Sequence, residues 1–108
     1  MSLKVGLEAE EKASSYLQKE GYTLLARNFH SKFGEIDIIA LKDNILHFCE
    51  VKFSEKYDPI TRITASKMTK IIKTINYYLL THPNSYDYQI DAILITPQEI
   101  EIIKNISY

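Results

Sequence analysis

Two short stretches of the chain place ionisable side chains inside otherwise apolar strands. Glu50 and Lys52 flank Val51 near the end of one stretch, and Glu35 and Asp37 open another. Because side chains alternate along a strand, Glu50 shares a face with Lys52, and Glu35 shares a face with Asp37. Charged groups near a core are costly unless they are paired or bind a metal. These two stretches are therefore the first candidates for a chemical site.

A further acid, Glu10, lies on the apolar side of the helix predicted over residues 3–20. It follows Leu7 by three residues and precedes Ala13 by three and Leu17 by seven, which is the spacing of a helix stripe that faces a core. The structural alternative is an acid near the helix start that complements the helix dipole. The inner position favours a role beside Asp37 and Glu50.

Together these residues predict a site for a hard divalent cation, Mg²⁺ or Mn²⁺, with a lysine beside it. In this interpretation Asp37 and Glu50 are the main metal ligands, and Glu10 completes the outer shell as a third. Lys52 orients a water molecule or stabilises the charge that grows on phosphorus during phosphodiester hydrolysis. The structural alternative is that Lys52 simply pairs with Asp37 or Glu50 on a solvent-facing surface of the sheet.

The elements that must position these residues are read from periodicity. Helical spacing predicts helices over 3–20 and 61–81, and residues rich in β-branched and aromatic types predict strands over 22–29, 36–41, 45–53, 88–96 and 100–106. The short polar link Lys42-Asp43-Asn44 favours an antiparallel hairpin, since Asp and Asn tolerate the positive φ of tight turns. The predicted fold is α/β, a central mixed five-stranded sheet flanked by two long helices in the order α-β-β-β-α-β-β.

Two segments, Gly34-Glu35-Ile36-Asp37-Ile38-Ile39-Ala40 and Phe48-Cys49-Glu50-Val51-Lys52, resemble the YraN-like family of small bacterial proteins. The resemblance covers nearly the whole chain and also includes Gly6, Glu10, Ala13, Gly21-Tyr22, Asn28, Lys67 and Asp91. It implies the restriction-endonuclease-like core that is also seen in archaeal Holliday-junction resolvases. The signature of that fold, PD-(D/E)xK, is an acid followed by E-x-K, which Asp37, Glu50 and Lys52 match.

This sequence departs from the family pattern at two positions, and the resemblance also implies an expectation about assembly. Relatives usually carry basic residues where this chain has His30 and Ser54, which removes charge that would bind phosphate. Resolvase relatives act as dimers, so the resemblance implies a possible homodimer. The same resemblance implies a metal-dependent nuclease as the activity.

Basic residues gather in one part of the chain. Residues 52–73 hold 6 basic and 2 acidic side chains, for a net charge of +4, between blocks of −2 and −3. Within it we expect phosphate contacts from Lys56, Arg62, Lys67, Lys70 and Lys73, the last three on one helix side. The alternative is a solubilising surface. No sequence-reading motif is evident, so we expect recognition of shape, as in branched or structured DNA.

Composition excludes several other classes. A chain of 108 residues with 45% hydrophobic and 25% charged residues predicts one globular domain over 1–108. No apolar run is long enough to span a membrane or to form a signal core, and the single Cys49 cannot form an internal disulfide, so we expect a cytoplasmic protein. A glycine-rich phosphate loop is absent, which argues against a nucleotide cofactor.

Three hypotheses remain open from the sequence. The first is a Mg²⁺-dependent endonuclease that cuts structured DNA with little sequence specificity. The second is a nucleic-acid-binding module of the same fold that cuts weakly or not at all. The third is a structural or adaptor domain.

Overall fold

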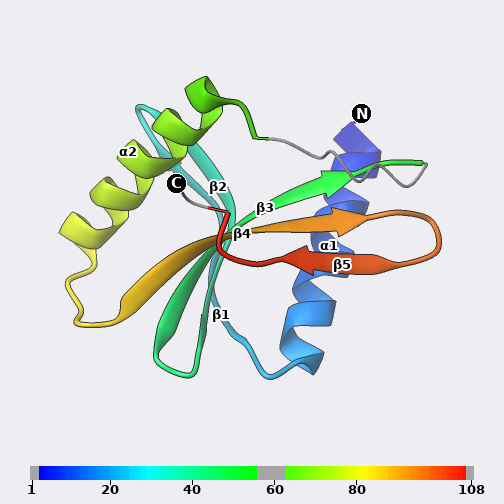
Figure 1. Cartoon of the computed structure of the whole chain (residues 1–108), viewed down its shortest axis with the longest axis horizontal. Coiled ribbons are helices and arrows are strands. Elements are labelled where there is room, and N and C mark those ends of the chain that lie inside the picture. The colour runs from blue at the N-terminus through cyan, green and yellow to red at the C-terminus, as the bar shows by residue number, and fades with distance from the viewer. Residues whose placement is uncertain (1–2, 56–62, 107–108) are drawn as a thin grey trace.

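The computed structural model of the chain describes residues 3–55 and 63–106. Its elements are α1 (Leu3–Lys19), β1 (Thr23–Ser31), β2 (Gly34–Lys42), β3 (Ile45–Phe53), α2 (Ala65–Thr81), β4 (Asp87–Ile95) and β5 (Ile100–Ile103). The predicted order α-β-β-β-α-β-β and the α/β class are confirmed (Figure 1). Neither of these helices is long and apolar enough to cross a membrane.

The five strands form one mixed sheet in the order β1-β2-β3-β4-β5. Strands β3 and β4 are parallel, and the other neighbouring pairs are antiparallel. The predicted hairpin joins β2 to β3, and Asp43 and Asn44 take up its positive φ angles of 53° and 62°. The parallel pair follows from the connection through α2, because a strand that returns in the same direction needs a long crossover.

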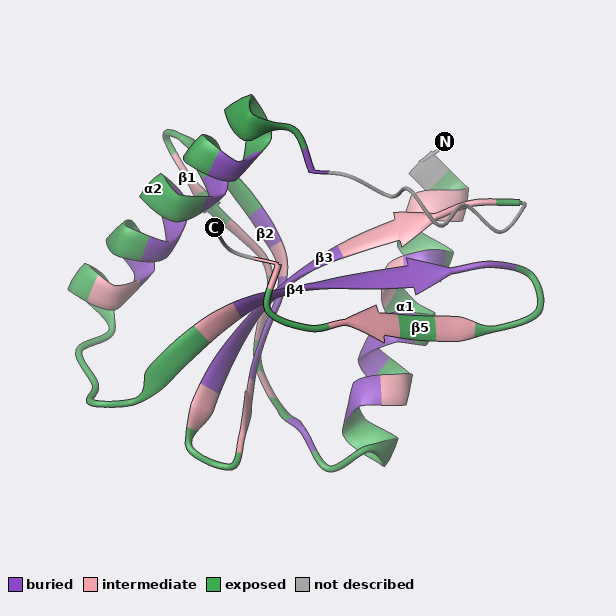
Figure 2. Cartoon of the chain, viewed as in Figure 1, coloured by how far each residue is buried: buried purple, intermediate pink, exposed green. Residues whose placement is uncertain are grey.

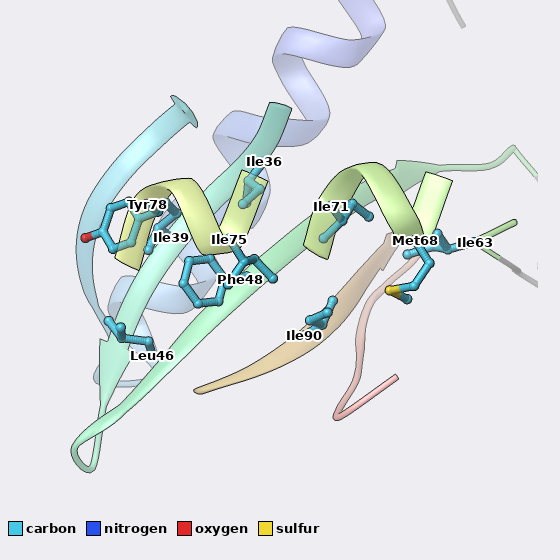
Figure 3. Close-up of a cluster of buried hydrophobic side chains, with 10 residues drawn as sticks. All are labelled: Ile36, Ile39, Leu46, Phe48, Ile63, Met68, Ile71, Ile75, Tyr78 and Ile90. Atoms are coloured by element: carbon cyan, nitrogen blue, oxygen red, sulfur yellow. The ribbon is translucent and has the colours of Figure 1, made fainter. Parts of the chain in front are cut away.

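The two helices cover opposite faces of the sheet, and the central part of β3 and most of β4 are buried between them (Figures 1 and 2). On the α2 face, Ile71, Ile75 and Tyr78 pack against apolar side chains of the sheet, among them Phe48 (Figure 3). On the α1 face, Ala9, Ala13 and Leu17 pack against a second set that includes Ile38, Ala40, Cys49 and Ile93. Burial of apolar surface on both faces holds the layers together.

Element ends differ from the prediction where side chains intervene. Helix α2 begins at Ala65 rather than at 61, because Thr64 acts as the N-cap and its hydroxyl accepts from the Lys67 N–H at 3.1 Å. Residues 61 and 62 lie outside the described residues. Strand β5 ends at Ile103 rather than at 106, and Asn105 turns the chain with a φ of 57°.

The buried carboxylate of Asp91 connects the centre of the sheet to the C-terminal segment. Its Oδ2 lies 2.7 Å from His47 Nδ1 on β3, and its Oδ1 accepts from Gln89 Nε2 at 2.8 Å and from the Asn105 N–H at 2.9 Å. Because Asp91 is buried, these three partners replace the water that it loses. The carboxylate therefore fixes the path of the chain after β5.

Replacement of Asp91 is expected to destabilise the fold strongly. Asp91→Ala should lower the free energy of unfolding by about 3 kcal/mol or more, because His47, Gln89 and the Asn105 N–H lose their acceptor. Urea unfolding followed by circular dichroism measures this change. The control Asp87→Ala removes an exposed acid from the first position of the same strand and should change stability by less than about 0.5 kcal/mol. Equal effects of the two substitutions would contradict the anchoring role.

Candidate functional site

The site begins where β2 and β3 separate. Their backbone pairing runs from the hairpin turn to the pair Ile38 and Cys49. Beyond this pair, the Val51 N–H donates to Asp37 Oδ2 at 2.8 Å, so a side chain takes the place of a backbone acceptor. Across β1, Asn28 departs from strand geometry with a φ of 51°, between the residues that pair with Ile36 and Ile38. We call this opening the strand fork.

Glu50 lies at the strand fork on the face that α2 covers, and only 3% of its surface is exposed. The Lys67 Nζ of α2 lies 3.4 Å from Glu50 Oε2 and forms an ion pair with it. The alternative in which Lys52 neutralises an acid on a solvent-facing sheet is therefore wrong for Glu50. Lys52 is half-buried two residues further along β3 and has no ion pair with a residue that the structure describes.

Electrostatics places the acids within reach of one another. Burial and, to a smaller extent, the charge of Asp37 raise the pKa of Glu50 to about 7, against the opposing effect of Lys67. Burial also raises the pKa of Asp37, the hydrogen bond from Val51 opposes this shift, and the nearby Glu10 adds to it. A mutual effect of this kind is typical of carboxylates that share one site.

Glu10 approaches the strand fork from α1, on the opposite face of the sheet from α2. Its Oε1 is buried and has no hydrogen-bond partner among the described residues, and the same holds for Glu50 Oε1. The hydroxyl of Ser14, one helical turn after Glu10, is also buried and has no hydrogen-bond partner among the described residues. Buried polar atoms without partners are rare, so these orphaned oxygens require an explanation.

The acids do not enclose a metal ion by themselves. Across residues 3–55 and 63–106, no group of three or more His, Cys, Asp or Glu side chains is arranged as a metal site. The donor chemistry nevertheless fits a hard cation, because Mg²⁺ keeps several water ligands and binds through one or two carboxylates. The unpartnered oxygens of Glu10 and Glu50 are donors that such an ion would satisfy.

The acid Glu35, which shares its strand with Asp37, lies outside this buried group. It is exposed, and its Oε2 lies 3.4 Å from His30 Nδ1. Its charge still contributes to the raised pKa values of Asp37 and Glu50. Glu35 therefore acts on the site from its rim.

The residues predicted to bind phosphate fall into three groups. Lys56 and Arg62 lie outside the described residues. Lys70 and Lys73 are exposed along α2. Lys67 instead points its amino group at Glu50, which the sequence analysis missed. The position of Lys67 near the start of α2 can be predicted from the sequence, but the partner of its amino group cannot.

Comparisons with known proteins agree with the resemblance noted in the sequence. The sequence model of one family, described as "Uncharacterised protein family UPF0102", matches residues 9–95 of the chain. A UPF0102 protein of Campylobacter fetus is 50% identical over 104 residues, which cover 95% of this chain and 93% of that protein. One from Nitratiruptor is 47% identical over 106 residues, with 98% and 95% covered, and one from Helicobacter pylori is 50% identical over 103 residues, with 95% and 90% covered. The chain therefore belongs to the UPF0102 family, the YraN-like family.

Proposed function

We propose that the chain is a metal-dependent endonuclease that hydrolyses phosphodiester bonds in branched or otherwise structured DNA with little sequence preference. The observation that carries this proposal is the state of Glu50, a buried carboxylate with one unpartnered oxygen and a pKa raised to about 7. A buried carboxylate of this kind destabilises the fold unless a cation or hydrogen-bond donors satisfy it. Strongly perturbed acids that converge at one point favour a functional site.

In this mechanism Asp37 and Glu50 would hold the cation, and Glu10 would reach it from α1. A bound Mg²⁺ or Mn²⁺ supplies positive charge that polarises a phosphoryl oxygen and lowers the pKa of a water molecule. Lys67 holds one oxygen of Glu50 through its ion pair and favours the ionised form of that carboxylate. Lys52, on the same face of β3, would stabilise negative charge on the reacting phosphate.

Helix α2 supports the choice of a nucleic-acid substrate. Residues Ala65–Thr81 contain Lys67, Lys70 and Lys73 and no acidic residue. Such a surface contacts phosphates without reading bases, so discrimination would rest on the shape of the substrate. The main alternative is a binding module of the same fold that does not cut, which the missing basic residues at His30 and Ser54 favour.

The first prediction tests the activity directly. Labelled four-way junction, flap, single-stranded and duplex DNA of matched sequence are incubated at low salt with Mg²⁺, Mn²⁺ or EDTA. Wild-type protein should cut a branched substrate only with a divalent cation, and Glu50→Gln should lower the rate by about 100-fold or more. The control Glu101→Gln neutralises an exposed acid on β5 and should leave the rate unchanged. Gel retardation without cutting on every substrate would favour the binding module instead.

The second prediction concerns pH and stability. The raised pKa of Glu50 means that the native state binds more protons than the unfolded state between about pH 4.5, its ordinary value, and about pH 7. Stability in EDTA should therefore fall as the pH rises through this window. At pH 8, Glu50→Gln should be more stable than wild type by on the order of 1–3 kcal/mol, and near pH 4 the two should agree.

Urea unfolding in EDTA at pH 4 and pH 8 measures this difference, with Glu101→Gln as the control. Addition of Mg²⁺ at pH 8 should stabilise the wild type more than Glu50→Gln, because ligand binding to the native state adds to its stability. A Glu50→Gln variant that is less stable than wild type at pH 8 in EDTA would contradict the buried, costly carboxylate.

The third prediction separates Lys67 from the other lysines of α2. Lys67→Gln removes the cation that lowers the pKa of Glu50, so the rise of activity with pH should move to higher pH. Lys70→Gln removes the same charge from the same helix and should weaken DNA binding without moving the pH profile. Lys67→Arg should restore most of the wild-type profile. Parallel changes in Lys67→Gln and Lys70→Gln would show that Lys67 acts only as a phosphate contact.

A further inference from the structure

A second feature lies on the exposed side of α2. The turn between β1 and β2 and the second half of α2 border a shallow, open groove of about 500 Å³, lined by Phe33, Lys73, Asn76, Tyr77 and Leu80. The large apolar side chains of this set are exposed, and Leu80 retains 78% of its surface. A cluster of exposed apolar side chains on a small protein is typical of a binding site. We call it the aromatic groove.

The turn between β1 and β2, which carries Phe33, lies against α2 (Figure 1). Ser31 Oγ lies 2.8 Å from Thr74 Oγ1 and also accepts from the Phe33 N–H at 3.1 Å. Gly34 lies close to α2, since a Cβ there would be in ordinary van der Waals contact with the Cβ of Lys70, at 3.5 Å. The ring therefore sits on a fixed turn.

The second ring of the groove is also supported. Tyr77 lies on α2 with its ring centroid 6.0 Å from that of the half-buried Phe29. Two aromatic rings, Phe33 and Tyr77, are thus presented to solvent by elements that are already packed. A preorganised aromatic surface loses little conformational entropy when it binds.

The charge around the aromatic groove is positive. Lys32 Nζ lies 5.2 Å and Lys73 Nζ 5.5 Å from the centroid of the Phe33 ring. The whole of α2 lacks acidic residues, and Lys70 continues the positive side toward Lys67 and the strand fork. Proteins that bind single-stranded nucleic acid typically stack bases on aromatic rings and contact phosphates with nearby cationic side chains.

We propose that the aromatic groove binds an unpaired DNA strand, with bases stacked on Phe33 and Tyr77 and phosphates beside Lys32 and Lys73. This inference rests on the proposed nuclease function and names its substrate class, DNA with a single-stranded flap or arm. Six residues of helix from Lys73 to Lys67 span about 9 Å. A strand in the groove would thus lie within a few nucleotides of the strand fork.

Charge complementarity favours DNA over a second copy of the chain as the occupant. In a two-fold symmetric dimer the same patch meets itself, so Lys32 and Lys73 would approach the same lysines of the other copy. Like charges that face each other across an interface weaken it. A phosphate backbone instead supplies the opposite charge.

The test uses the full chain in EDTA, so that binding is measured without cutting. Fluorescence anisotropy follows a labelled oligothymidylate and an abasic strand of equal length, which has the same phosphates but no bases. Wild type should bind the oligothymidylate more tightly than the abasic strand. Phe33→Ala and Tyr77→Leu should each weaken oligothymidylate binding by about 5- to 100-fold, since stacking on one aromatic ring contributes about that much.

Matched controls separate stacking and charge from general effects. Tyr86→Ala removes an equally exposed tyrosine outside the groove and should leave binding unchanged. Lys73→Gln should reduce the slope of log affinity against log salt by about 0.7, whereas Lys19→Gln at the end of α1 should leave the slope unchanged. If Phe33→Ala fails to fold by circular dichroism, Phe33→Leu keeps an apolar side chain on the turn and should still bind more weakly.

Three results would overturn the inference. They are equal affinity for the abasic strand, unchanged binding by the Phe33 variants, and a sedimentation mass that falls from dimer to monomer in those variants. Cleavage of junction DNA together with any of these results would reject the aromatic groove and leave the nuclease standing. Binding that depends on Phe33 without any metal-dependent cleavage would support the groove and reject the nuclease.

Discussion

The hydrogen bond from the Val51 N–H to the carboxylate of Asp37 is the interaction on which the site depends. Two antiparallel strands can separate inside a protein only if the backbone groups they release find other partners. Asp37 supplies that partner, so β2 and β3 diverge after Ile38 and Cys49 without leaving the Val51 N–H unpaired. The same bond holds Asp37 at the opening, where its charge raises the pKa of Glu50 on β3.

The concentration of acids at the strand fork opposes folding, and the rest of the molecule compensates for it. Burial disfavours the ionised forms of Asp37 and Glu50, and the ion pair with Lys67 offsets only part of this cost. Burial of the apolar side chains under α1 and α2 stabilises the fold and offsets the destabilising effect of the buried acids. Local features that destabilise a fold are expected at functional sites, because stability and function select for different side chains.

The sequence predicts the elements well because their signals are local. Periods of 3.6 and 2 residues identify two helices and five strands, and the Asp43-Asn44 turn fixes the antiparallel hairpin. The inward position of Glu10 follows from the same helical period. The ends of elements were less well predicted, because the cap at Thr64 and the bond from Asn105 to Asp91 depend on single side chains.

Contacts between distant elements could not be predicted in the same way. The ion pair of Lys67 with Glu50 depends on where α2 docks on the sheet, and no local pattern encodes that position. The lysine of the E-x-K pattern, Lys52, was therefore the natural sequence-based partner for the acids. The pairing of Ser31 with Thr74, which places Phe33 beside α2, joins residues 43 positions apart and is equally invisible.

The charge distribution bears on how the proposed nuclease would admit DNA to the strand fork. The chain has a net charge of −1, and Lys70 and Lys73 are exposed along α2. A phosphate drawn in by Lys70 and Lys73 would therefore meet Glu10, Asp37 and Glu50, whose charges repel it. Lys67 is already engaged with Glu50 and neutralises one of these acids. In the proposed function, a divalent cation bound between the remaining carboxylates would reverse the sign of the local field, so binding of metal and binding of substrate would be coupled at this site.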